Sequence, residues 1–115
     1  DAKLLPFAEA EAGATGLELL LPLTLKWSSN HKASLQNAIA KITSEAAAIL
    51  GINSGNLSVG ANADIAIFDP EAAWKVTPTA LNSQGKNTPF INMELTGKVI
   101  YTLMNGQITY QGKMK

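Results

Sequence analysis

The side chains of this sequence that could carry out chemistry are few and widely spaced. His31 is the only histidine and cysteine is absent, so the several ligands of a histidine- or cysteine-based zinc site cannot be assembled. A Ser–His–acid triad would also have to use His31, and no Gly-x-Ser-x-Gly turn supplies its serine. Because His31 lies in a polar stretch, we interpret it as a solvated surface residue.

The remaining candidates for chemistry are two carboxylates and two glycines. Asp64 and Asp69 could act together as an acid–base pair, but both flank a short apolar run, where aspartate is common at strand ends. Gly55 and Gly60 have the spacing of phosphate-binding glycines, but the Lys-Ser/Thr pair of such loops does not follow them. We therefore expect no catalytic residue, bound metal or phosphate loop in this segment.

The composition excludes several classes of function. The chain has 115 residues, of which 46% are hydrophobic, enough for one domain or for a piece of a larger one. Its net charge is zero and all nine basic residues are lysines, which argues against a nucleic-acid partner. No apolar run reaches the roughly 18–20 residues of a membrane span, and no signal peptide is visible. We expect a cytoplasmic protein that binds neither nucleic acid nor membrane.

The first half of the sequence predicts helices, beginning with residues 17–27. Six leucines are distributed almost all round this helix, so it should be buried on most sides, with Pro22 tolerated in its first turns. The remaining 90 or so residues are too few to enclose it, and the chain begins at Asp1 rather than Met. We therefore expect an incomplete domain, with an oligomer interface as the alternative explanation of the leucines.

Two shorter helices follow, each with recognisable terminal residues. Residues 35–42 form an amphipathic pattern, with Ser34 as the N-cap. The next helix has Thr43 or Ser44 as its expected N-cap, and Gly51 provides the left-handed residue that ends it.

The second half predicts short strands joined by turns. The strand candidates are residues 65–68, 73–76, 98–104 and 107–111. Asp69-Pro70 should close the first strand, and residues 83–89 should form a loop. Asn105-Gly106 supplies the two positive-φ positions of a type I′ turn and predicts a hairpin between the last two strands.

Three stretches together give the chain a resemblance to a known family. Residues 3–18 are similar to the pattern K-x-x-P-F-x-x-A-x-x-G-x-x-G-L-E, and residues 60–69 to G-x-x-A-D-hydrophobic-D. The third stretch, residues 83–110, contains K-N-T-P-F, G-K-V and the Asn-Gly hairpin. In these patterns the chain resembles the C-terminal part of a dihydroorotase of the amidohydrolase superfamily.

The resemblance implies an α/β fold that is the C-terminal end of a TIM-barrel metallohydrolase plus part of a small β-sandwich. Residues 1–52 would be the end of the (β/α)8 barrel, comprising the loop after its eighth strand and its final helices. Residues 53–115 would be the C-terminal part of a composite β-sandwich, whose sheet should have an unpaired edge in this segment.

The same resemblance implies a function for the parent protein. Dihydroorotases interconvert N-carbamoyl-L-aspartate and L-dihydroorotate in pyrimidine biosynthesis, with zinc and a catalytic aspartate that would lie before this chain. The only family site residues that carry over are Ala12 and Gly13, whose backbone would contact substrate, although a simple tight turn is the alternative. Ala12 stands where many relatives have proline or a bulkier residue, so the substrate assignment stays open.

Several alternatives to an active dihydroorotase therefore remain. One is a non-catalytic, dihydroorotase-like structural partner of aspartate carbamoyltransferase, and another is an allantoinase or hydantoinase. A free-standing β-rich interaction domain would require the chain to fold alone. The partners expected from the resemblance are the rest of the amidohydrolase barrel, a second copy in a homo-oligomer and, in the non-catalytic case, the carbamoyltransferase.

Overall fold

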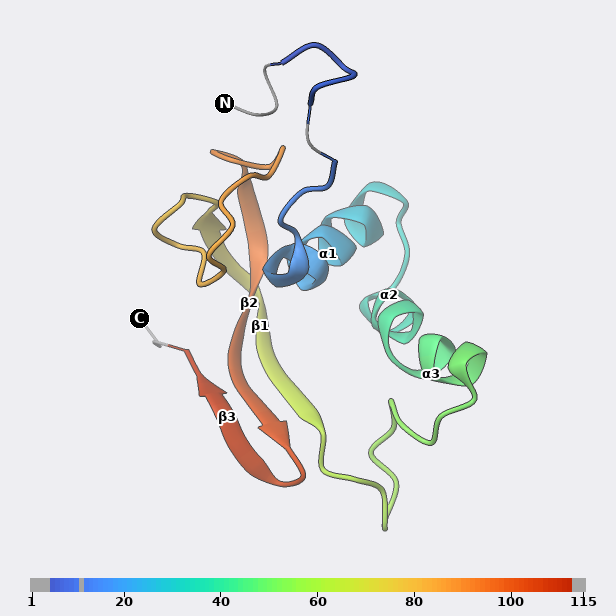
Figure 1. Ribbon diagram of the computed structural model, residues 1–115. Coiled ribbons are helices and arrows are strands. Elements are labelled where there is room, and N and C mark those ends of the chain that lie inside the picture. The colour runs from blue at the N-terminus through green and yellow to red at the C-terminus, as the bar shows by residue number, and fades with distance from the viewer. Residues whose placement is uncertain (1–4, 11, 113–115) are drawn as a thin grey trace.

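The computed structural model describes residues 5–10 and 12–112. In chain order it contains the 3-10 helix η1 (Leu17–Leu19), the helices α1 (Leu20–Asn30), α2 (Leu35–Ile42) and α3 (Ser44–Leu50), and the strands β1 (Ile65–Lys75), β2 (Glu94–Met104) and β3 (Gln107–Gln111). Helix α1 packs on β2, α2 packs on α1, and α3 packs on α2, so the helices extend away from the sheet (Figure 1). Within the described residues, no helix combines the length and the apolar character needed to span a bilayer.

The helices form where their terminal residues predict them. Ser34 accepts a hydrogen bond from the backbone N–H of Asn37 (3.2 Å), as an N-cap does. Gly51 ends α3 with φ 66° and ψ 27°, in the left-handed region that glycine adopts at low cost.

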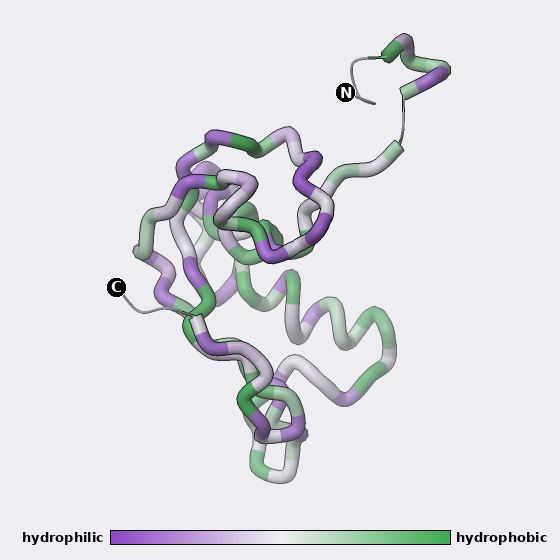
Figure 2. The backbone as a smooth tube through the Cα atoms, turned by 60° about the vertical axis from the view of Figure 1, so that its left-hand side comes forward, coloured by the Kyte–Doolittle hydropathy of each residue, from purple (hydrophilic) through white to green (hydrophobic). Residues whose placement is uncertain are grey.

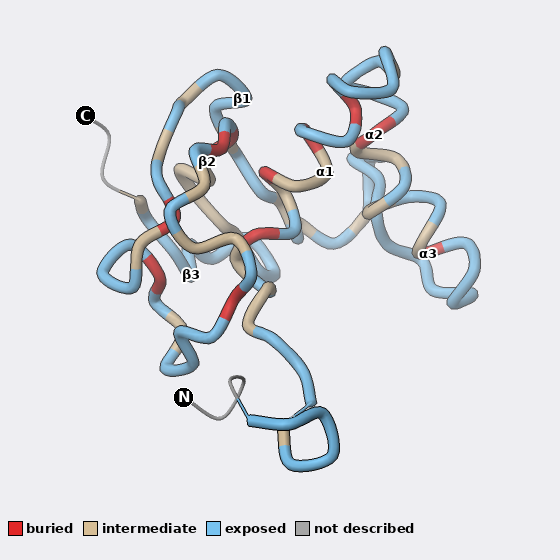
Figure 3. Tube along the Cα trace, turned by 90° about the horizontal axis from the view of Figure 1, so that it is seen from above, coloured by how far each residue is buried: buried red, intermediate tan, exposed pale blue. Residues whose placement is uncertain are grey.

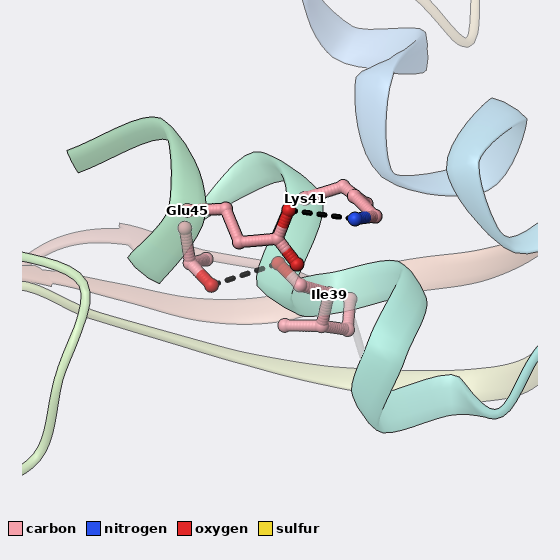
Figure 4. A network of polar contacts seen from close by, with 4 residues as sticks. Ile39, Lys41 and Glu45 are labelled. Carbon is pink, nitrogen blue, oxygen red and sulfur yellow. Dashed lines mark hydrogen bonds and ion pairs between the residues drawn. The ribbon is translucent and has the colours of Figure 1, made fainter. Parts of the chain in front are cut away.

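Thr43 is the N-cap residue of α3, one of the two predicted for it, but its side chain makes no capping hydrogen bond. Its hydroxyl donates to the carbonyl of Ile39 (2.7 Å) rather than accepting from α3. This bond gives a partner to a carbonyl in the last turn of α2, where the helix itself supplies no donor. Lys41 and Glu45 join the two helices with an exposed ion pair of 2.6 Å (Figure 4).

The sheet is antiparallel, with the strand order β1-β2-β3. The predicted hairpin between β2 and β3 is confirmed, and both turn residues have positive φ, 50° at Asn105 and 78° at Gly106. The two short strands predicted before it are in fact one strand, β1, with an irregularity between Asp69 and Ala73. Pro70 lies in that irregularity, on an outer strand, where its missing N–H breaks no regular ladder bond.

The core lies where the start of the helical half meets the sheet. Its buried residues are Leu19, Val76, Leu81 and Leu95. The partly buried residues around them are Leu23, Trp74, Phe90, Ile91 and Met93. Most of this core therefore comes from the C-terminal end of β1, the first residues of β2 and the loop that joins these two strands.

Much of the apolar surface is left uncovered. Leu17 is 85% exposed and Ile49 is 86% exposed. The leucine helix predicted over residues 17–27 begins as η1 and continues as α1 to Asn30, three residues further than predicted. Figure 2 shows hydrophobic stretches along the helical half, and in Figure 3 most positions of α2 and α3 are exposed or intermediate. The radius of gyration is 16.3 Å, against about 13 Å expected for a compact chain of this length. The leucine helix is therefore not enclosed by the described residues, in agreement with the sequence analysis.

Candidate functional site

Two segments far apart in the sequence meet beside the start of η1, and we call them together the two-loop site: residues 12–18 and residues 82–88. The backbone N–H of Thr15 donates to the carbonyl of Asn87 (2.7 Å). The Asn87 side-chain amide donates in turn to the carbonyl of Gly13 (3.4 Å). The loop of residues 12–18, which contains the predicted substrate contacts, is therefore hydrogen-bonded to the loop of residues 82–88 between β1 and β2.

Glu18 forms the strongest polar link of the two-loop site. Its carboxylate accepts hydrogen bonds from the backbone N–H groups of Asn82 and Ser83 (both 2.8 Å) and from the Ser83 hydroxyl (2.6 Å). Partial burial acts to raise the pKa of the Glu18 carboxyl, but these bonds and the charge of Lys86 outweigh it. The pKa of Glu18 therefore lies below its ordinary value of 4.5.

The lowered pKa of Glu18 predicts a pH-dependent contribution to stability. A carboxyl group with a lower pKa in the folded state stabilises that state above the unfolded-state pKa, and the contribution is lost as the pH falls through the folded-state value. We expect Glu18→Gln to destabilise the protein at pH 7, by a margin that shrinks as the pH falls below 4.5. Urea unfolding of both proteins at several pH values measures that margin, and a margin independent of pH would contradict the assignment.

Ala12 and Gly13, the predicted substrate contacts, both lie at the surface. Gly13 has φ +87°, and no described atom beyond its chain neighbours lies within 4 Å of the place where a Cβ would stand. The backbone here is thus open to a ligand, and an L-residue at position 13 would be strained. Whether Ala12 and Gly13 contact substrate stays a prediction. Lys3, Leu4 and Glu11 of the same motif lie outside the described residues.

The other residues considered for chemistry have local structural partners. The Nδ1 atom of His31 lies 2.9 Å from the carbonyl of Trp27, and the two rings stack with centroids 5.2 Å apart. Asp64 accepts from the backbone N–H of Asn105 (2.8 Å) and so supports the hairpin turn. Asp69 accepts from the backbone N–H groups of residues 71 and 72, at the irregularity in β1. Both aspartates therefore act as turn residues.

The described residues do not fit a zinc site. Among them, no group of three or more His, Cys, Asp or Glu side chains is placed to hold a metal ion. A hollow of about 460 Å³ lies between α1 and the sheet, with Trp74 and Val99 among its lining residues. It does not include Ala12 or Gly13, and its carboxylate, Glu18, is already bonded to the loop at residues 82–83.

Comparison with known proteins identifies the family. The sequence profile described as the amidohydrolase family matches residues 27–110, which include the helices α2 and α3 and the sheet except for the last residue of β3. The chain belongs to the amidohydrolase family.

Individual amidohydrolases match nearly the whole chain. The dihydroorotase of Syntrophotalea carbinolica is 44% identical over 111 residues, which are 96% of this chain and 26% of that protein. A dihydroorotase-like protein of Pseudomonas putida is 40% identical over 110 residues, again 96% of this chain and 26% of that protein. The chain therefore spans about a quarter of the length of the curated amidohydrolases it matches.

The fold is likewise that of a solved amidohydrolase. The L-hydantoinase (dihydropyrimidinase) from Arthrobacter aurescens matches with a TM-score of 0.80 and 31% identity, over 90% of this chain and 24% of that one. The mixed α/β arrangement with its three-stranded antiparallel sheet is thus a structure found in this family.

Sequence reasoning did not single out Glu18 and Asn87 as site residues. Both are polar residues within the motifs that carried the resemblance, Glu18 in G-L-E and Asn87 in K-N-T-P-F. Glu18 is also an acidic side chain within a leucine-rich segment, and that unusual position was the signal available in the sequence.

Proposed function

We propose that this chain is the C-terminal part of a dihydroorotase, a cyclic-amide hydrolase that interconverts N-carbamoyl-L-aspartate and L-dihydroorotate. The observation that carries the proposal is the 44% identity to the Syntrophotalea carbinolica dihydroorotase across 96% of the chain. The contact between the loops of residues 12–18 and 82–88 supports it, since each loop contains one of the dihydroorotase-like motifs.

Within that protein, we assign residues 1–52 to the end of the TIM barrel and residues 53–115 to the composite β-sandwich. The exposed apolar side chains of the helical half support this division, because a barrel wall would cover them. The outer strands β1 and β3 each have only β2 as a neighbour among the described residues, which leaves edges for further strands of a sandwich.

For the reaction itself, the contribution we assign to this chain is substrate binding. The open, positive-φ backbone at Gly13 allows a carboxylate or ring carbonyl of the substrate to approach main-chain groups closely. Zinc and the groups that bind it belong, on this proposal, to the part of the protein outside this chain.

Two other functions each have a specific observation in their favour. The 40% identity to the dihydroorotase-like protein of Pseudomonas putida favours a dihydroorotase-like chain, for which our alternative is a non-catalytic structural partner of aspartate carbamoyltransferase. The likeness to the Arthrobacter aurescens L-hydantoinase favours a hydrolase of a different cyclic amide. We place both below dihydroorotase because the identity to the Syntrophotalea carbinolica dihydroorotase, 44%, exceeds the 40% and 31% found for these two proteins.

The test is an assay of the full-length protein with several cyclic amides. We expect hydrolysis of L-dihydroorotate, and the reverse condensation of N-carbamoyl-L-aspartate, at rates at least tenfold above those with hydantoin or allantoin. Faster turnover of hydantoin or allantoin would contradict the substrate assignment. Absence of turnover with all three, together with co-purification of a carbamoyltransferase, would favour the non-catalytic alternative.

A further inference from the structure

The loop of residues 82–88 is firmly anchored to the core of the chain. It is preceded by Leu81, which is 4% exposed, and followed by Phe90 and Ile91, which pack against the same core. Thr88 is buried, and its hydroxyl accepts from the backbone N–H of Phe90 (3.3 Å). Because the residues on both sides of the loop pack in or against the core, we expect the polar residues between them to be held in one position.

The segment of residues 12–18, in contrast, makes most of its described hydrogen bonds with the loop of residues 82–88. Gly13 and Thr15 are held through Asn87, and Glu18 is held through the backbone at residues 82–83. A Cβ on Gly85 would lie 2.6 Å from the Thr15 hydroxyl, so the two loops are in close contact at this point as well.

We propose that Asn87 and Glu18 are positioning residues for the substrate. They hold residues 12–18, which we call the Gly13 loop, in the conformation that binds the cyclic amide. The inference rests on the proposed function, because it takes the Ala12–Gly13 backbone as a substrate contact. The Asn87 side chain donates a hydrogen bond to the Gly13 carbonyl. Glu18, at the other end of the segment of residues 12–18, accepts from the backbone N–H groups of residues 82 and 83. Neither residue was singled out by the family resemblance as a contact of the substrate.

The physical reason is the freedom of glycine. Gly13 loses more backbone entropy on ordering than any other residue type would, so an untethered loop samples many conformations before the substrate binds. A loop that is already held in the bound conformation saves that ordering free energy at the binding step. Loss of the tether should therefore weaken substrate binding more than it slows the chemical step.

The sharpest variant is Asn87→Asp in the full-length protein, because aspartate has the shape of asparagine but cannot donate to the Gly13 carbonyl. We expect the KM for L-dihydroorotate to rise about fivefold, the effect of one lost hydrogen bond, with kcat changed by less than twofold. Amide hydrogen exchange of residues 12–16 should become faster to a similar extent. Asn62→Asp is the matched control, since Asn62 is exposed and lies at the other end of β1.

Glu18→Gln is the second variant, and it should raise KM in the same direction because a neutral amide accepts hydrogen bonds less strongly than a carboxylate. An unchanged KM in both variants of an active enzyme would overturn the positioning role, as would a fall in thermal stability with no change in KM. Absence of dihydroorotate turnover in the wild-type protein would instead overturn the proposed function, and unchanged hydrogen exchange at residues 12–16 would overturn the tether itself.

Discussion

Replacing Gly97 with alanine should destabilise the full-length protein by roughly 2–5 kcal/mol, through backbone strain and overpacking together. Gly97 is buried in β2 with φ +101°, a conformation that L-residues adopt only with strain. A Cβ at this position would lie 2.4 Å from the Cδ1 atom of Leu25 but 3.7 Å from the Cα atom of Pro22, so the Leu25 side chain would have to leave its present position between α1 and the sheet. The Gly97 carbonyl also accepts from the indole N–H of Trp74 (3.0 Å), which resists a compensating shift of the strand.

Gly60→Ala is the matched control for this prediction. Gly60 has a similar φ, +86°, but no described atom beyond its chain neighbours lies within 4 Å of its missing Cβ. Its replacement should therefore cost only the backbone strain, about 1 kcal/mol. Urea unfolding of the two variants measures the difference, and equal losses of stability would contradict close packing between α1 and β2 at Gly97.

The features that the sequence predicted correctly are those with a local physical cause. Ser34 caps a helix because its side chain reaches a backbone N–H three residues away, and Gly51 ends a helix because it lacks a Cβ. Asn105-Gly106 forms the hairpin turn because both residues tolerate positive φ. Each of these effects acts within four residues, so it can be recognised without knowledge of the fold.

The features that were missed depend on longer-range structure. Pro70 and the turn residues beside it predicted the end of a strand, but pairing with β2 resumes at Ala73 and makes one interrupted strand. Thr43 is the N-cap residue of α3 as predicted, but its hydroxyl donates to the carbonyl of Ile39 in the preceding turn and so makes no capping bond.

The contacts of the candidate site also depend on longer-range structure, and the sequence did not predict them. The Gly13 loop was predicted as a substrate contact only through the family resemblance, and nothing in its local sequence indicates what holds it. Glu18 and Ser83 are separated by 65 positions in the chain, and their contact arises only because the core brings η1 and the loop after β1 together. Contacts of this kind have no signal in the spacing of residues along a single sequence.

The second large effect that we expect is the complete dependence of activity on the rest of the protein. On the proposed function, the rest of the barrel covers the leucine and isoleucine side chains that are exposed in the helical half. The proposed function assigns zinc and its ligands to the part of the protein outside this chain. We therefore expect the purified segment of residues 1–115 to bind no stoichiometric metal and to show no detectable hydrolysis of L-dihydroorotate.

The measurement that tests this most directly compares the full-length protein with the purified segment of residues 1–115, by zinc content and by turnover of L-dihydroorotate. We expect bound zinc and chelator-sensitive turnover in the full-length protein, and neither in the segment. Chelator-sensitive turnover by the segment alone would contradict the central claim that the reactive centre lies outside this chain.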